Sequence, residues 1–322
     1  MVIEKNAYIT VLNNKVVYDQ TFKMVESNNR YARFFNQNNI QVNGRAVEYL
    51  LAWPKTGPDW KPDLSIHKGN DFKRELNVVP FRLTRLLDTV EHECINEERL
   101  LEALESETAV KDLTKNLLAQ TADKINMRLE AKIPELICQD ANFIPHDEDT
   151  GKGNLFEADE KKFEDPVWIL EQLFNGSSIL RKQSADFNKG YPEDPDDKSS
   201  DYLPTETNIN SYQKMFVLLD STVKNKIAVG GYKENMNFQA LDLEKRFGAH
   251  NIEEDILPNG YKMLLMDERC LQLYKRAKAE GFKHKEEPEN GNNWFFLNPV
   301  IHGGFITAFS AMAWKAKGDL LE

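Results

Sequence analysis

The hydrophobic positions of the sequence show a helical period most clearly near its middle. There, apolar side chains recur every three or four residues, as in a helix that buries a single stripe, at Val110, Leu113, Leu117, Leu118, Ala122, Ile125, Leu129 and Ile133. We predict one long helix over 107–133, opened by Ser106 and ended or bent by Pro134. A shorter helix, capped by Asn96, is expected just before it.

Other stretches show different patterns. A continuous apolar run at 215–219 indicates a strand that is covered on both faces, and 261–267 indicates a second buried strand. The stretch 76–95 indicates extended structure, in which Pro80 requires an edge or a bend. The remaining predicted elements are one or two helices over 166–187, a helix over 237–247 stopped by Gly248, a helix over 268–280 stopped by Gly281, and an apolar closing strand over 305–314.

The first 75 residues lack the pattern of a compact fold. Residues 1–35 mix short β-type runs with Asn pairs, which suggests an arm that pairs with another element. Asn43-Gly44 is a hairpin-turn signal between alternating residues. Trp53 and Trp60 follow in a stretch whose proline density excludes a helix or a central strand. A long segment of this kind usually signals function or a partner surface, although its rings could also close on the chain's own core.

Composition and charge narrow the class of protein. The chain has 322 residues, 41% of them hydrophobic, and a formal net charge of −11. This is typical of a globular protein and argues against one that grips nucleic acid. The excess of acids lies in 140–165 and 186–206, whose prolines and glycines indicate solvated loops. No apolar run approaches membrane-spanning length, the start lacks a secretory pattern, and three separated cysteines suit a reducing compartment.

Patterns that carry catalysis are scarce. The sequence contains no G-x-S-x-G, phosphate-loop or H-E-x-x-H motif. Clustered carboxylates at 146–151 could hold calcium, but the spacing differs from an EF-hand and a solvated turn is favoured. His92 and Cys94 share a face of the expected strand without the further ligands that a metal needs. A structural role is favoured for His302. We predict no catalytic residue, no enzyme activity, no metal site and no cofactor.

The order of these elements is similar to that of a known family. The stretches that carry the resemblance are Phe187-Asn188, Leu257–Arg269 and Asn298–Trp314. With the arm, the hairpin loop and the long helix, the chain resembles the major capsid proteins of tailed double-stranded DNA bacteriophages, most of all those of small short-tailed phages (podoviruses). The resemblance implies an α+β chain with the Hong Kong 97-type capsid fold. Its implied parts are an N-terminal arm (1–35), an extended β-hairpin loop (36–75), a peripheral domain with the spine helix (76–140 and 300–322) and an axial α/β domain (141–299).

The resemblance also implies a function. Copies of the chain would form the hexamers and pentamers of an icosahedral shell around the phage genome, in the virion capsid, after assembly in the host bacterial cytoplasm and without contact to a membrane. Implied partners are a separate scaffolding protein, a portal protein, and packaged double-stranded DNA that is held only weakly. The candidate intersubunit residues are Trp53, Trp60, Asn43, Gly44, Tyr49 and Tyr8.

Two other functions and one modification stay open. An encapsulin-like compartment would share the fold but enclose a cargo enzyme instead of a genome. A cytosolic enzyme would use 210–300 as an α/β core and the acidic loops as a lid. Lys–Asn cross-links between subunits, known in part of the family, would need a loop lysine near an Asn and a Glu; Lys55, Lys61 and Lys68 are candidates.

Overall fold

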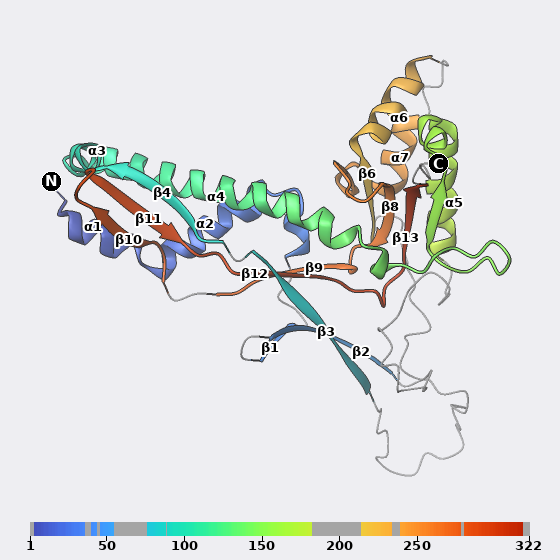
Figure 1. Ribbon diagram of the computed structural model, residues 1–322, viewed down its shortest axis with the longest axis horizontal. Coiled ribbons are helices and arrows are strands. Elements are labelled where there is room, and N and C mark those ends of the chain that lie inside the picture. The colour runs from blue at the N-terminus through green and yellow to red at the C-terminus, as the bar shows by residue number, and fades with distance from the viewer. Residues whose placement is uncertain are drawn as a thin grey trace, which may run out of the picture. The chain divides into compact units, whose positions relative to one another are not determined.

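The computed structural model forms two compact units, which we describe separately (Figure 1). The structure describes residues 3–35, 40–43, 46–54, 76–87, 89–181, 214–233, 239–277 and 280–317. Unit 1 comprises Met1–Gln37, Thr84–Ile133 and Leu273–Gly303, and unit 2 comprises Asn38–Leu83, Pro134–Gln272 and Gly304–Glu322. Four elements cross this division: α4 (Glu107–Ile137), β3 (Leu76–Leu87), β9 (Leu271–Lys275) and β12 (Ile301–Phe305).

The other elements each belong to one unit. Those of unit 1 are α1 (Lys5–Leu12), α2 (Lys15–Asn28), η1 (Ala32–Phe34), β4 (Glu91–Asn96), α3 (Glu97–Leu104), β10 (Lys283–Glu287) and β11 (Asn292–Leu297). Those of unit 2 are β1 (Ile40–Asn43), β2 (Ala46–Pro54), η2 (Asp140–Asn142), β5 (Leu155–Ala158), η3 (Glu160–Glu164), α5 (Pro166–Leu180), β6 (Met215–Asp220), α6 (Ser221–Lys233), α7 (Gln239–Phe247), η7 (Ala249–Asn251), β7 (Ile252–Asp255), β8 (Tyr261–Asp267) and β13 (Ala311–Ala316).

Helix α4 confirms the predicted long helix and its buried stripe. The stripe positions from Leu117 to Ile133 are buried, and Val110 and Leu113 are half-buried. The prediction was that Pro134 ends or bends the helix; the helix passes through Pro134 and therefore does not end there. Proline cannot donate the usual helical hydrogen bond, and we attribute the continuation to the burial of Ile137, which is 0% exposed.

A three-stranded antiparallel sheet in unit 1, in the order β10-β11-β4, packs against α4 (Figure 1). Two ion pairs join them: Lys124 to Glu93 at 2.8 Å, and Arg128 to Glu91 at 2.9 Å. The Glu91 side chain is 2% exposed. A buried carboxylate needs a partner, so these pairs fix the position of β4 along the helix. The capped helix predicted after Asn96 is also confirmed, as α3.

The N-terminal residues are helical, which corrects the prediction of a β-type arm. The Asn14 side chain caps α2 by accepting a hydrogen bond from the Val16 amide at 3.0 Å. Tyr18, Phe22 and Val25 recur at helical spacing and are all 0% exposed. The β-branched residues had suggested strands, but burying this helical face outweighs their local preference.

In unit 2, a five-stranded sheet has the order β5-β13-β8-β6-β7. One hydrophobic cluster joins β6, β8 and β13 to α5, α6 and α7, and these helices cover one face of the sheet (Figure 1). Trp314 of β13 is 2% exposed and contacts α5 at Gly176, where an added Cβ would lie 3.0 Å from the indole. The buried strands predicted over 215–219 and 261–267 are confirmed as β6 and β8.

Unit 2 also contains the predicted hairpin, which is formed by strands β1 and β2. Strands β1 and β2 pair antiparallel with Asn43 opposite Ala46, which shows a hairpin at the place of the turn signal, although Gly44 lies outside the described residues. Strand β2 continues along β3 as far as Pro54 opposite Leu76. The pairing of β1 with β2 reaches only to Tyr49. Among the described residues, Pro54 therefore lies where β2 has a single partner, as proline requires.

Two predictions in this region are wrong. The described residues of the predicted helix over 268–280 do not form a helix, and they contain strand β9 instead. The Asp267 side chain accepts hydrogen bonds from the backbone amide and the guanidinium of Arg269, at 2.6 to 2.9 Å, which turns the chain directly after β8. The acidic stretch 140–165 is not simply a solvated loop, because it contains β5 and the buried Phe163. The stretch 186–206 lies outside the described residues.

The two units divide the chain differently from the predicted domains. Strand β13 pairs parallel with β5 and antiparallel with β8, so this part of 300–322 belongs to the α/β sheet and not with the spine helix. Residues 273–299, which were assigned to the axial domain, form part of unit 1 and include β10 and β11. Strand pairing between distant segments decides both placements.

Candidate functional site

The candidate intersubunit residues differ in where the structure places them. Trp53 and Asn43 are described by their backbone in β2 and β1, whereas Trp60 and Gly44 lie outside the described residues. Tyr49 is 4% exposed, and its ring meets the edge of Phe309 at 6.5 Å. The Arg269 guanidinium lies 4.3 Å from the centroid of the same Phe309 ring. Tyr49 therefore supports the hairpin from inside unit 2.

Tyr8 also packs inside its own unit. The side chain is 3% exposed, and its hydroxyl is 3.2 Å from the Thr114 hydroxyl of α4. Burial raises the pKa of Tyr8, and the hydrogen bond to Thr114 opposes the shift. Contacts of Tyr8 or Tyr49 with another subunit stay a prediction, and both rings have most of their surface occupied by their own chain.

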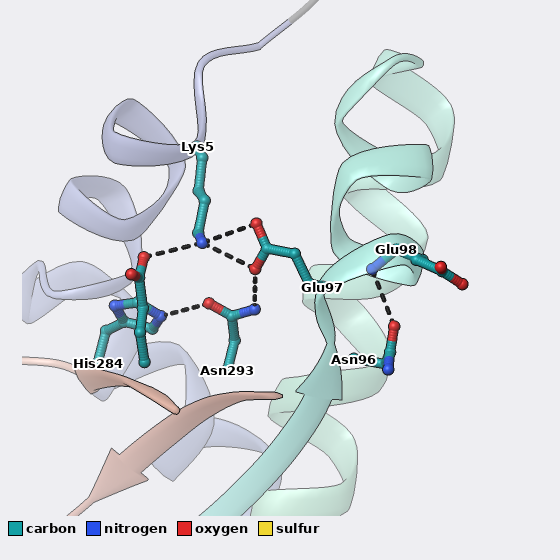
Figure 2. Close-up of polar contacts among 7 residues, drawn as sticks. Lys5, Asn96, Glu97, Glu98, His284 and Asn293 are labelled. Carbon is teal, nitrogen blue, oxygen red and sulfur yellow. Dashed lines mark hydrogen bonds and ion pairs between the residues drawn. The ribbon is translucent and has the colours of Figure 1, made fainter. Parts of the chain in front are cut away.

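A polar cluster holds the N-terminal helix to unit 1. We call Lys5, Glu97, His284, Glu286 and Asn293 the N-terminal cluster (Figure 2). The Lys5 ammonium lies 2.8 Å from the carboxylates of both Glu97 and Glu286. The Asn293 amide donates to Glu97, and its oxygen is 2.9 Å from Nε2 of His284. The cluster thus joins α1 to α3, β10 and β11.

The two main charges of the cluster stabilise each other. Hydrogen bonds from Lys5 and then Asn293 lower the pKa of Glu97, against a small opposing effect of burial. Burial lowers the pKa of Lys5, but hydrogen bonds to Glu286 and Glu97 outweigh it and raise the pKa overall. Both groups are therefore charged at neutral pH. Glu98, the next residue along the chain, uses its backbone amide to bond the Asn96 cap at 2.9 Å, and its carboxylate points away (Figure 2).

The cluster brings together a lysine, a glutamate and an asparagine, the three residue types that a Lys–Asn cross-link needs. A lysine attacks an amide only as the neutral amine. Here two carboxylates hold Lys5 in its ammonium form, and its side chain is 20% exposed to water. The geometry therefore makes an electrostatic anchor and not a cross-linking site. The loop lysines Lys55, Lys61 and Lys68 lie outside the described residues.

Backbone hydrogen bonds also hold the end of helix α1 to the residues just before β10. The Gly281 amide donates to the Asn13 carbonyl at 3.0 Å, and the Phe282 amide donates to the Leu12 carbonyl at 2.9 Å. An added Cβ at Gly281 would lie 2.2 Å from the Leu12 oxygen, so only glycine permits this approach. Sequence reasoning missed this contact because Gly281 was interpreted as the end of a helix.

The chemical candidates named from the sequence lie apart from one another in the described part of the chain, in the 146–151 turn, on β4 and on β12. Among the described residues, His, Cys, Asp and Glu side chains nowhere form a group of three that could hold a metal ion. In the 146–151 turn, Asp147 accepts hydrogen bonds from the Asp149 amide and the Thr150 hydroxyl at 2.8 to 3.0 Å. His92 and Cys94 are exposed on one face of β4, as predicted. No helix in the described part of the chain has the length and apolarity to cross a membrane.

Comparisons with known proteins rest on structure, since no protein-family model and no curated protein matches the sequence. A chain in the capsid structure of Staphylococcus phage Andhra is similar with a TM-score of 0.53 at 9% identity, over 88% of this chain and 82% of that chain. A chain in the structure of the head fiber and inner core protein gp22 of native bacteriophage P68 is similar with a TM-score of 0.53 at 12% identity, over 89% and 84%.

These likenesses establish the fold. The chain has the Hong Kong 97-type fold of phage capsid proteins, in a mixed helix-and-sheet architecture, which confirms the predicted fold class. At identities of 9% and 12% the similarity extends to the fold alone.

Proposed function

We propose that this chain is the major capsid protein of a tailed bacteriophage and that its copies form an icosahedral shell. The observation that carries the proposal is the likeness to a chain of the Andhra capsid structure over 88% of this chain. A match of that extent accounts for most of the polypeptide with one architecture. The hairpin β1–β2–β3 adds support, because a ribbon of this kind can reach a neighbouring copy.

The hairpin and the segment after it are the proposed contact with neighbouring subunits. Trp53 and Trp60 would be the anchors, with Asn43 and Gly44 shaping the turn, while Tyr49 and Tyr8 would support the elements from inside. Prolines restrict the segment before docking, so less conformational entropy is lost on binding. Each contact can be modest because every subunit of a closed shell makes many contacts at once.

The proposed partners follow from a shell that is filled with a genome. Hexamers and pentamers would assemble with a separate scaffolding protein and a portal protein in the host bacterial cytoplasm, and the product would be the virion capsid. The net charge of −11 favours weak contact with the packaged double-stranded DNA, because an acidic wall does not hold phosphates. We further propose that the phage belongs to the podoviruses, on the resemblance of the order of sequence elements to their coat proteins.

Electron microscopy of the expressed chain tests the proposal. We expect shells or shell fragments in negative stain, with more complete particles when a scaffolding protein is added. The double variant Trp53→Ala/Trp60→Ala should give folded subunits, by circular dichroism, that form no shells. Met127→Ala, at a 73% exposed position on α4, is the control and should assemble normally. Normal particles from the double variant would refute the anchor role.

The same preparations separate the two other functions. A cargo compartment would yield particles that contain a protein cargo and lack both DNA and a portal vertex. A cytosolic enzyme would remain a monomer or small oligomer by light scattering under every assembly condition. Either result would overturn the capsid proposal.

A further inference from the structure

Asn-Gly pairs occur at four places in the chain, at 43–44, 175–176, 259–260 and 290–291. Such a pair can react with itself, because glycine has no side chain to keep its backbone nitrogen away from the amide of the preceding Asn. The reaction requires that the Asn side chain can turn toward that nitrogen and that the glycine backbone can adjust. Gly44 lies outside the described residues, so the structure allows the other three pairs to be compared.

The pair Asn290-Gly291 lies in the turn between β10 and β11. Asn290 is exposed, Gly291 has a φ of 62°, and a Cβ added at Gly291 would meet no atom within 4 Å. No backbone carbonyl of the described residues accepts a hydrogen bond from the Gly291 amide. Hydrogen bonds from Trp294, then Asn292 and last Asn290 lower the pKa of Glu287, so the Asn290 side chain is held by the weakest of the three and within its own hairpin. The turn therefore leaves both reacting groups room to approach each other.

The fold holds the other two described pairs. Asn175 and Gly176 lie within α5, where helical hydrogen bonds engage the backbone amides, and an added Cβ at Gly176 would lie 3.0 Å from the Trp314 indole. The Asn259 side chain donates to the Cys138 carbonyl at 2.8 Å, which fixes it to the backbone of a distant segment. Reaction at either pair would require native contacts to break, whereas the turn between β10 and β11 needs no such change.

We propose that Asn290 is a site of spontaneous deamidation, at which the side-chain amide becomes a carboxylate. The Gly291 nitrogen attacks the side-chain carbonyl carbon of Asn290, a new C–N bond forms, and the bond from that carbon to Nδ2 breaks. The proton of the Gly291 amide leaves with Nδ2 as ammonia. One water molecule then opens the resulting cyclic imide at either of its two carbonyls, which gives aspartate or isoaspartate. The sequence needs no oxidant or reductant.

The product alters the contact between this hairpin and α3. The Gly291 carbonyl accepts a hydrogen bond from the Glu97 amide at 2.7 Å, at the first residue of α3. The isoaspartate form lengthens the backbone by one carbon directly before Gly291 and so displaces the acceptor of this bond. Both forms add a negative charge to a turn that already carries Glu287 and Glu289. The inference does not depend on the proposed function.

Mass spectrometry of the full chain tests the site. The folded protein is kept at mildly basic pH in water enriched in heavy oxygen and is then digested, and fragment ions locate each conversion of an amide to a carboxylate that carries oxygen from the solvent. We expect the converted fraction at Asn290 to exceed the fractions at Asn175 and Asn259 at least several-fold. In urea, where the fold no longer holds any pair, the three fractions should become similar. Asn290→Gln should lose the modification, because its longer side chain does not form the five-membered ring.

Three results would overturn the proposal. One is equal conversion at the three pairs in the folded chain. Another is an unmodified Asn290 in the folded chain after a time in which the unfolded chain reacts at all three pairs. The third is a mass change that persists in Asn290→Gln, which would assign the reaction to the neighbouring Asn292 or Asn293. The wild-type comparison uses no variant, so it decides even if Asn290→Gln fails to fold.

Discussion

Neutralising Glu97 should loosen the N-terminal helix while leaving the rest of unit 1 in place. The Glu97→Gln variant keeps the size of the side chain and its ability to accept the Asn293 hydrogen bond. It removes the negative charge that lies 2.8 Å from the Lys5 ammonium. Glu286 still pairs with Lys5, so the cluster is weakened and not abolished.

The size of the effect is set by exposure. The side chains of Lys5 and Glu97 are 20% and 36% exposed, so water screens their ion pair and its contribution is about 0.2–1 kcal/mol. The Asn293 hydrogen bond joins β11 to α3 and persists when α1 opens, so it does not add to this effect. The expected effect is therefore about 0.2–1 kcal/mol, or roughly a 1.4- to 5-fold change in the local opening equilibrium.

Hydrogen exchange of the Lys5–Leu12 amides measures this opening, and Glu98→Gln is the matched control. Glu98 also lies in the first turn of α3, so its loss has the same effect on the helix dipole, but its carboxylate does not contact the cluster (Figure 2). The lowered pKa of Glu97 predicts that wild type and Glu97→Gln differ above its ordinary value of 4.5 and converge as the pH falls through the lowered value. Equal exchange in Glu97→Gln and Glu98→Gln at neutral pH would refute the anchor.

Two further predictions concern packing in unit 1. Leu129→Ala, at a 0% exposed position of α4, should lower the free energy of unfolding by about 2–5 kcal/mol. Met127→Ala, at an exposed position of the same helix, should change it by less than about 0.5 kcal/mol. Denaturant titrations measure both values, and similar values for the two variants would contradict the assigned buried face. Gly281→Ala should break its hydrogen bond to Asn13 and speed proteolysis of the N-terminal helices, because an added Cβ would lie 2.2 Å from the Leu12 oxygen. Unchanged cleavage in Gly281→Ala would count against the close approach.

The sequence predicted the elements whose signals are local. The signals for the stripe of α4, the Asn96 cap, the buried strands β6 and β8, and the hairpin of β1 and β2 each lie within a short stretch of sequence. Periodicity, capping chemistry and turn preference act over that range, so one sequence suffices to find them.

The elements and contacts that the sequence did not predict have a different physical origin. The helices of residues 5–28 form because Tyr18 and Phe22 bury against distant parts of unit 1, which local preference does not report. The N-terminal cluster joins Lys5 to Glu97, 92 residues apart, and Glu97 to Asn293, 196 residues apart. Strand β9 follows a turn set by the Asp267 side chain, a signal that was present but was interpreted as the start of a helix. Long-range partners are invisible to periodicity.

The position of β13 in its sheet determines when that sheet can be completed during translation. This strand, Ala311–Ala316, lies between β5 and β8 and not at the margin of its sheet. During translation, β5 therefore has no partner in that sheet and β8 keeps an open side until synthesis passes residue 310. The five-stranded sheet of unit 2 can therefore be completed only after residues 311–316 have left the ribosome.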